Sequence, residues 1–187
     1  MKVLIYGGSG SGKSEFAEKL ASDLSADRIY LATMKVYDAE DKKRIDKHRN
    51  MRKDYNFKTL EKTTDVDNAL DSYFDGVLLL ECLSNLVANE MFSGSEQDMH
   101  HDNENNDEEK INKLILKIKN NIFNLSNKVK NMVVVSNNIF DDGTIYDKSV
   151  TGYLDALGRI NAELSKEFDE VIEVVCGIPL IIKSVNK

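Results

Sequence analysis

Short apolar runs alternate along the chain with longer segments of helical periodicity. The first run, residues 2–6, ends at a glycine, and the apolar positions of residues 14–24 that follow recur at helical spacing. Similar strand-like runs occur at residues 28–32, 57–61, 77–81, 132–136 and 171–176, separated mostly by helix-length segments. Alternation of this kind predicts an α/β fold, with a mainly parallel sheet and helices on both faces.

Two further segments complete the predicted fold. Residues 108–125 carry one apolar stripe opposite lysines and asparagines, which predicts a packing helix. Residues 178–183 form a last apolar run, and they contain Pro179, the only proline of the chain. Because proline cannot donate to a sheet ladder, this run is predicted as an edge strand in an antiparallel hairpin. The length predicts a single domain, residues 1–187.

Acidic residues are concentrated in one segment of the chain. The formal net charge is −7, and residues 93–109 hold seven Asp and Glu residues with no Lys or Arg, so the remainder is neutral. We expect residues 93–109 to form an acidic, mobile surface loop. We expect no nucleic acid as a partner, because binding to a polyanion depends on a basic surface that this composition lacks.

The apolar runs and the cysteines indicate the cellular setting. No apolar run reaches 18 residues, so we expect no membrane insertion and a cytoplasmic location. Cys82 and Cys176 lie far apart at the ends of apolar runs and have no metal-binding spacing. We expect both to be free, buried thiols.

A phosphate-binding pattern lies between the first predicted strand and the first predicted helix. Residues 7–14 read GGSGSGKS and match G-x-x-x-x-G-K-[ST]. Glycines let the backbone wrap around phosphate oxygens, and the N-terminus of the following helix adds a partial positive charge. We expect Lys13 to reach the β- and γ-phosphates and Ser14 to bind Mg²⁺. The loop residues expected to contact the nucleotide are Gly7, Gly8, Ser9, Gly10, Ser11, Gly12, Lys13 and Ser14.

An acidic residue closes one of the buried runs. P-loop proteins usually carry an acid at the end of a strand near the loop, and Glu81 ends the run of residues 77–81. Glu81 is therefore the candidate second Mg²⁺ ligand, and a surface cap on the strand is the alternative. Asn137 is followed by Asn138 rather than by the Lys of an Asn-Lys-x-Asp guanine motif, which disfavours a Ras-like GTPase.

His48 lies in a basic segment, residues 38–53, that is predicted to be helical. Arg44 and Arg52 are four residues before and after it, so the three side chains would share one face. A nucleoside triphosphate would balance this charge, and the neighbouring cations would lower the pKa of His48 and keep its imidazole nucleophilic. Taken alone, the pattern also fits a solvated basic face.

Seven segments of the chain together carry a resemblance to one known family. They are residues 7–18 (GGSGSGKSEFAE), 30–34 (YLATM), 44–52 (RIDKHRNMR), 59–61 (TLE), 79–90 (LLECLSNLVANE), 134–137 (VVSN) and 158–161 (GRIN). In order and spacing they resemble the bifunctional adenosylcobinamide kinase/adenosylcobinamide-phosphate guanylyltransferase family of cobalamin biosynthesis, over nearly the whole chain. The P-loop is generic, whereas the histidine segment and the Leu-Leu-Glu-Cys segment are specific.

The resemblance implies a RecA-like P-loop domain that carries out two reactions. ATP or GTP would phosphorylate the aminopropanol hydroxyl of adenosylcobinamide, and GTP would then transfer GMP through a guanylylated His48 to give adenosylcobinamide-GDP and pyrophosphate. His48 and Lys13 would be catalytic, Ser14 and Glu81 would hold Mg²⁺, and Glu81 alternatively would bind the guanosine. Outside the P-loop the implied nucleotide contacts are Ala32, Thr33, Met34, Arg49, Asn50, Met51, Arg52, Glu61 and Glu81. The family also implies a homotrimer with sites near subunit boundaries.

The chain departs from the family pattern in one region. Where the family commonly has Asn-Glu-Val-Gly, this chain has Asn137-Asn138-Ile139-Phe140, and it lacks an arginine that often precedes the aspartate at Asp155. The departures change neither the P-loop nor His48. They bear instead on the kinase reaction, whose substrate-binding residues would lie in this altered stretch. Two alternatives stay open: a P-loop kinase of another small metabolite, with His48 passive, and a non-catalytic nucleotide-binding regulator.

Overall fold

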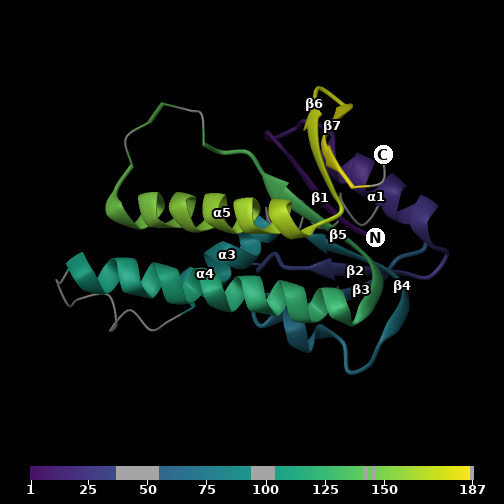
Figure 1. Cartoon of the computed structure of the whole chain (residues 1–187), viewed down its shortest axis with the longest axis horizontal. Helices are drawn as coiled ribbons and strands as arrows, with labels where there is room; N and C mark the ends of the chain where they lie inside the picture. Colours follow the sequence, from purple (N-terminus) through teal and green to yellow (C-terminus); the bar gives the residue numbers. More distant parts are fainter. Residues whose placement is uncertain (37–54, 94–103, 141–142, 145, 186–187) are drawn as a thin grey trace.

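Seven strands form one sheet in the computed structural model, which describes residues 1–36, 55–93, 104–140, 143–144 and 146–185 (Figure 1). The strands follow the order β3-β2-β4-β5-β1-β6-β7 across the sheet. All neighbours are parallel except β6 and β7, which form an antiparallel hairpin at one edge. The strands are β1 (Lys2–Gly7), β2 (Arg28–Ala32), β3 (Lys58–Glu61), β4 (Phe74–Glu81), β5 (Val129–Asn137), β6 (Glu170–Val175) and β7 (Ile178–Ser184).

Helices cover both faces of the sheet, as predicted. The helix α1 (Lys13–Leu24) packs on one face, against β1, β4, β5 and β6 (Figure 1). The other face carries α3 (Leu83–Phe92), α4 (Glu104–Asn127) and α5 (Lys148–Glu167), and a short 3-10 helix, η2 (Val66–Ala69), packs against α4. No helix in the described ranges is long and apolar enough to cross a membrane.

The buried strands place alternate side chains in two separate cores. Val3 and Ile5 of β1 belong to the core beneath α1, whereas Leu4 between them belongs to the core beneath α3, α4 and α5. Because successive side chains of a strand point to opposite faces, strands buried on both faces are apolar at almost every position. Burial on both faces therefore explains why the strands appear in the sequence as continuous apolar runs.

The structure corrects the boundaries of the predicted acidic loop. Residues 104–109 belong to α4, which begins at Glu104 rather than at residue 108, whereas residues 94–103 lie outside the described part. Polar composition suggested a loop, but acidic side chains are favourable in the first turns of a helix because they face its positive end.

The hairpin confirms the predicted edge strand and corrects the environment of one cysteine. Pro179 lies in β7, which pairs only with β6 among the described strands. Cys82 is buried as expected, but Cys176 is exposed because it lies in the turn between β6 and β7, with a φ of 51°. Both thiols are free.

Candidate active site

The P-loop connects the carboxyl end of β1 to the first turn of α1. Gly10 and Gly12 have φ angles of 69° and 87°, a region that favours glycine, and the N–H of Ser11 donates to the carbonyl of Gly8 at 3.2 Å. Gly12 is the N-cap of α1, and no side chain of the described residues caps this end. The free N–H groups of the first turn are therefore available to an anion.

Lys13 is held inside the loop. Its side chain is largely buried, and Nζ donates to the carbonyl of Gly8 at 3.1 Å. Burial lowers the pKa of Lys13, since desolvation disfavours the ammonium. A polyphosphate beside Nζ would reverse this effect, because an adjacent negative charge favours the protonated form.

The ends of three neighbouring strands bring an acid pair to the same edge. Ala32 of β2 is in register with both Glu61 of β3 and Glu81 of β4. Since adjacent strands are about 4.8 Å apart, the two carboxylates flank the end of β2. Glu81 faces the P-loop rather than capping a surface strand, because its Oε1 accepts a hydrogen bond from the hydroxyl of Ser14 at 2.5 Å.

The Ser14–Glu81 pair has the chemistry of a Mg²⁺ site. Oε2 of Glu81 is buried and has no hydrogen-bond partner among the described residues. Hydroxyl and carboxylate oxygens are ligands that Mg²⁺ accepts, and with triphosphates it commonly takes only one or two from the protein. The two side chains present therefore fit the predicted metal.

A cavity of about 630 Å³ opens in front of the P-loop and extends along the ends of β2 to β5. Such a volume is ample for a nucleotide. Its lining comprises Ser9, Gly10, Ser11, Gly12, Lys13, Ser14, Glu15, Tyr30, Ala32, Met34, Val36, Thr59, Glu61, Glu81, Cys82, Asn85, Val135, Asn137 and Ile139. Most of the predicted nucleotide contacts that the structure describes thus share one cavity.

Thr33 differs from its predicted neighbours. It is buried and does not line the cavity. Its hydroxyl donates to the carbonyl of Cys82 and accepts from the N–H of the same residue, both at 2.8 Å. Thr33 therefore joins the end of β2 to the start of α3. The predicted contacts His48, Arg49, Asn50, Met51 and Arg52 lie outside the described residues, and their roles stay predictions.

The turn of the β6–β7 hairpin supports the outer side of the P-loop. The N–H of Gly177 donates to the carbonyl of Ser11 at 2.8 Å. A Cβ at Gly12 would lie 3.3 Å from the Cα of Gly177, and a Cβ at Gly7 would lie 2.5 Å from the carbonyl oxygen of Val174. Glycine at these positions lets the loop and the hairpin approach closely.

A polar network lies under the cavity at the end of β5. The amide of Asn137 donates to Oγ of the buried Ser84 at 2.6 Å, and Oγ also lies 2.9 Å from Sγ of Cys82. Tyr153 of α5 donates to the carbonyl of Ser84 at 3.3 Å, and burial raises the pKa of Tyr153 to about 12, so the hydroxyl stays protonated. Burial also raises the pKa of Cys82, which disfavours a nucleophilic thiolate.

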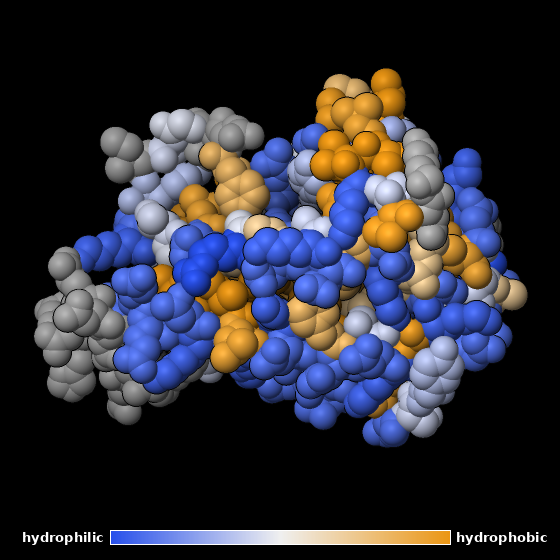
Figure 2. Space-filling model, in the orientation of Figure 1, coloured by the Kyte–Doolittle hydropathy of each residue, from blue (hydrophilic) through white to orange (hydrophobic). Residues whose placement is uncertain are grey.

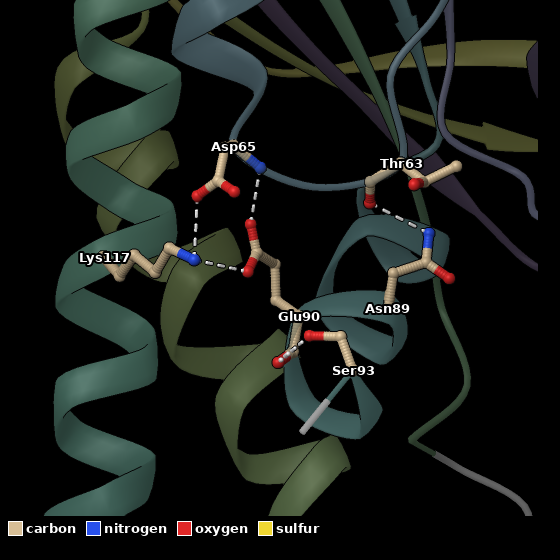
Figure 3. Close-up of polar contacts among 6 residues, drawn as sticks. All are labelled: Thr63, Asp65, Asn89, Glu90, Ser93 and Lys117. Carbon is tan, nitrogen blue, oxygen red and sulfur yellow. Dashed lines mark hydrogen bonds and ion pairs between the residues drawn. The ribbon is translucent and has the colours of Figure 1, made fainter. Parts of the chain in front are cut away.

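The carboxyl end of α3 holds the loops that leave β2 and β3 (Figure 3). The buried Asn89 donates from Nδ2 to the carbonyls of Thr33 and Thr63, at 2.7 and 3.0 Å. Next to it, the carboxylate of Glu90 accepts from the N–H of Asp65 at 2.8 Å and pairs with Lys117 of α4 at 2.7 Å. These contacts set the position of the cavity wall that carries Met34 and Glu61.

Replacing Asn89 with leucine should destabilise the protein by about 2 to 4 kcal/mol, because the buried carbonyl of Thr33 and the half-buried carbonyl of Thr63 lose their donor. Urea unfolding of the variant and the wild type measures this difference. Ser93→Ala is the matched control, because Ser93 is exposed and its hydroxyl makes one long hydrogen bond, 3.3 Å, to the carbonyl of Glu90. Its free energy of unfolding should stay within about 0.5 kcal/mol of the wild type. An unchanged urea midpoint for Asn89→Leu would show that Asn89 does not hold the loops that leave β2 and β3.

Several lining residues were not singled out as contacts from the sequence: Tyr30, Val36, Thr59, Asn85, Asn137 and Ile139. Asn137 had a usable signal, since it is a polar residue closing an apolar run, as Glu81 is. Asn85 had a weaker signal, since it lies in the first turn of α3, only four residues after Glu81.

Comparison with solved structures finds the same fold in two ATPases. It aligns with a solved chain described as an ATPase domain with a TM-score of 0.50 and 13% identity, covering 99% of this chain and 77% of that one. A type III secretion system ATPase aligns with a TM-score of 0.53 and 10% identity, over 92% of this chain and 51% of that one. At such identities the likeness shows the fold alone, and the RecA-like P-loop fold is confirmed.

Comparison of sequences identifies the family. The family model described as cobinamide kinase / cobinamide phosphate guanyltransferase matches residues 3–182. Bifunctional adenosylcobalamin biosynthesis proteins named CobU, from Escherichia coli (strain K12) and Salmonella typhimurium (strain LT2), are each 31% identical over 98% of this chain and 100% of their own length. The corresponding CobP of Pseudomonas aeruginosa is 26% identical over 98% of both chains. The chain therefore belongs to the cobinamide kinase / cobinamide phosphate guanyltransferase family.

Proposed function

We propose that this chain phosphorylates adenosylcobinamide with ATP or GTP and then transfers GMP from GTP to the resulting phosphate, using one P-loop for both triphosphates. The observation that carries the proposal is the cavity in which Lys13, Ser14 and the acids Glu61 and Glu81 surround one space. Family membership supports the pair of reactions.

The P-loop residues bind and orient the triphosphate. Free N–H groups of the first turn of α1 donate to phosphate oxygens, and Lys13 exchanges its bond to Gly8 for one to the β- and γ-phosphates. Ser14 and Glu81 would hold Mg²⁺, which neutralises charge on the phosphates when bound. This arrangement makes Glu81 a metal ligand, and Glu61 would then be the acid that contacts the nucleoside.

In the kinase reaction the substrate hydroxyl attacks the γ-phosphorus. In the second reaction the proposed nucleophile is His48, whose imidazole attacks the α-phosphorus of GTP while pyrophosphate leaves. Oxygen of adenosylcobinamide phosphate then attacks the same phosphorus and releases the histidine. Support for this covalent route is the sequence around His48, in which Arg44 and Arg52 flank it at helical spacing.

Labelled GTP tests the proposal directly. Incubation of the protein with GTP labelled at the α-phosphorus should leave label on the chain that survives base and is lost in acid, as expected of a phosphoramidate. Addition of adenosylcobinamide phosphate should move the label to adenosylcobinamide-GDP, and EDTA should prevent labelling. A protein that phosphorylates another metabolite would retain no label, and a nucleotide-binding regulator would consume no substrate.

The same proposal covers assembly and location. The resemblance implies a homotrimer, and large apolar side chains lie exposed on the β6–β7 hairpin, where Figure 2 shows a continuous apolar area. They are Val175, Ile178, Leu180, Ile181 and Ile182. Light scattering on the purified protein tests the stoichiometry, and a monomer at micromolar concentration would exclude the homotrimer.

The proposal also includes a cytoplasmic location, because the two reactions use ATP and GTP as substrates.

A further inference from the structure

The cavity in front of the P-loop has two chemically different ends. At the β2–β3 end it is lined by Tyr30, Met34 and Thr59 together with Glu61, a mixture of flat, apolar and polar groups suited to a nucleoside. At the β4–β5 end it is lined by two amides, Asn85 and Asn137, with Ile139 beside them. The P-loop follows β1, which is next to β5 in the sheet, so the two amides lie on the phosphate side of a triphosphate whose nucleoside occupies the β2–β3 end.

Asn137 is held in position from below. Its Nδ2 donates to Oγ of Ser84 at 2.6 Å, and Ser84 is buried beneath the cavity against Sγ of Cys82. The other half of the Asn137 amide has no hydrogen-bond partner among the described residues, and the residue lines the cavity. One end of the side chain is therefore anchored while the other is available to a ligand.

Asn137 also lies next to the phosphate-binding loop. It is in register with Gly7, the first residue of the P-loop, and the N–H of Asn138 donates to the carbonyl of Gly7 at 2.9 Å. Two residues earlier, Val135 is in register with Glu81. Adjacent strands are about 4.8 Å apart, so a group bound to Asn137 lies within reach of a phosphate held by Lys13.

We propose that Asn137, assisted by Asn85, forms the subsite for the alcohol that the kinase reaction phosphorylates. The subsite rests on the proposed function, and it assigns the acceptor to the β4–β5 end of the cavity. The alcohol oxygen forms a bond to the γ-phosphorus, and the bond from that phosphorus to the β,γ-bridging oxygen breaks. The nucleoside diphosphate leaves with the electron pair, and the alcohol proton passes to water. The amide orients the oxygen for this displacement, which depends mainly on positioning.

The neighbouring residue provides a matched control. The side chain of Asn138 lines a separate cavity of about 390 Å³, together with Tyr6 and Phe140, while its backbone makes the contact with Gly7. Asn137→Ala and Asn138→Ala therefore remove the same group from consecutive positions of one strand end. Only the first loses an amide from the P-loop cavity.

The test compares the kinase and self-guanylylation activities of both variants with the wild type. Asn137→Ala should lower kcat/KM for adenosylcobinamide on the order of 10- to 100-fold, while KM for ATP and labelling by GTP stay within about twofold. Ser84→Ala, which frees the amide without removing it, should lower the same kcat/KM by less. Asn138→Ala should match the wild type.

Each other outcome has a distinct meaning. Unchanged kinase kinetics in Asn137→Ala would overturn the subsite while leaving the proposed function intact. Equal loss of kinase activity and GTP labelling in Asn137→Ala would show that Asn137 acts in nucleotide binding or in folding. If Asn138→Ala lost as much kinase activity as Asn137→Ala, the effect would come from the end of the strand and not from the Asn137 amide. A wild-type protein that does not phosphorylate adenosylcobinamide would overturn the proposed function and the subsite together.

Discussion

Replacing Lys13 with alanine should lower both the kinase rate and the guanylylation rate, each by about 10²- to 10³-fold. Lys13 is 9% exposed and is held against the carbonyl of Gly8, so it meets the phosphates in a site with little water. In such surroundings a cation stabilises the charge that develops during phosphoryl or nucleotidyl transfer far more than it would in water. Steady-state assays with ATP and with GTP measure the two losses.

Lys19→Ala is the control for the Lys13 variant. Lys19 lies on the same helix but is exposed, so its removal changes the net charge equally without touching the cavity. Both rates should stay within about twofold of the wild type, as for most surface substitutions. If Lys13→Ala lost only one of the two activities, the proposal that one P-loop binds both triphosphates would be wrong. Separate nucleotide sites would then be required.

Replacing His48 with alanine should abolish labelling of the chain by GTP and the formation of adenosylcobinamide-GDP, while the kinase reaction continues. The first two depend on a covalent bond from the imidazole, whereas the kinase reaction needs only the P-loop and an acceptor alcohol. The expected loss is at least about 10³-fold, the scale on which removing a catalytic nucleophile acts. Mass measurement of the chain after incubation with GTP detects the missing GMP adduct.

His101→Ala controls for the loss of an imidazole elsewhere in the chain, since the acidic segment around it has no predicted role in catalysis. Labelling should be unchanged in this variant. GMP transfer at the normal rate by His48→Ala would refute the covalent route. Parallel loss of kinase activity would instead assign His48 to binding of the triphosphate.

The strands were predictable because their cause is local. Strand β2 was predicted at its observed bounds, Arg28–Ala32, and the last strand at residues 178–183 of the observed Ile178–Ser184. Buried strands of a parallel sheet are apolar on both faces, so short apolar runs identify them without knowledge of their neighbours. The boundary of α4 was less accurate, because the acidic residues of its first turns have the composition of a loop.

The phosphate loop was predictable for a similar reason, and parts of its surroundings were not. The spacing of Gly7, Gly12 and Lys13 already specifies a phosphate-binding turn between a strand and a helix. The exposure of Cys176 depends on its place in the turn where β6 pairs with β7, and the inward orientation of Thr33 depends on its hydrogen bonds to Cys82, which is distant in the sequence. Periodicity carries no information about such contacts.

The chain by itself determined the class of fold, the P-loop and the acid at the end of a buried strand, because each is a pattern of nearby residues. Only the tertiary structure decided that Glu81 meets Ser14, that Glu61 lies one strand beyond Ala32, and that Asn137 lies beside Gly7. These juxtapositions follow from the order β3-β2-β4-β5-β1 across the sheet. Strand order is set by how helices and strands pack over the whole domain, a property that no local stretch of residues contains.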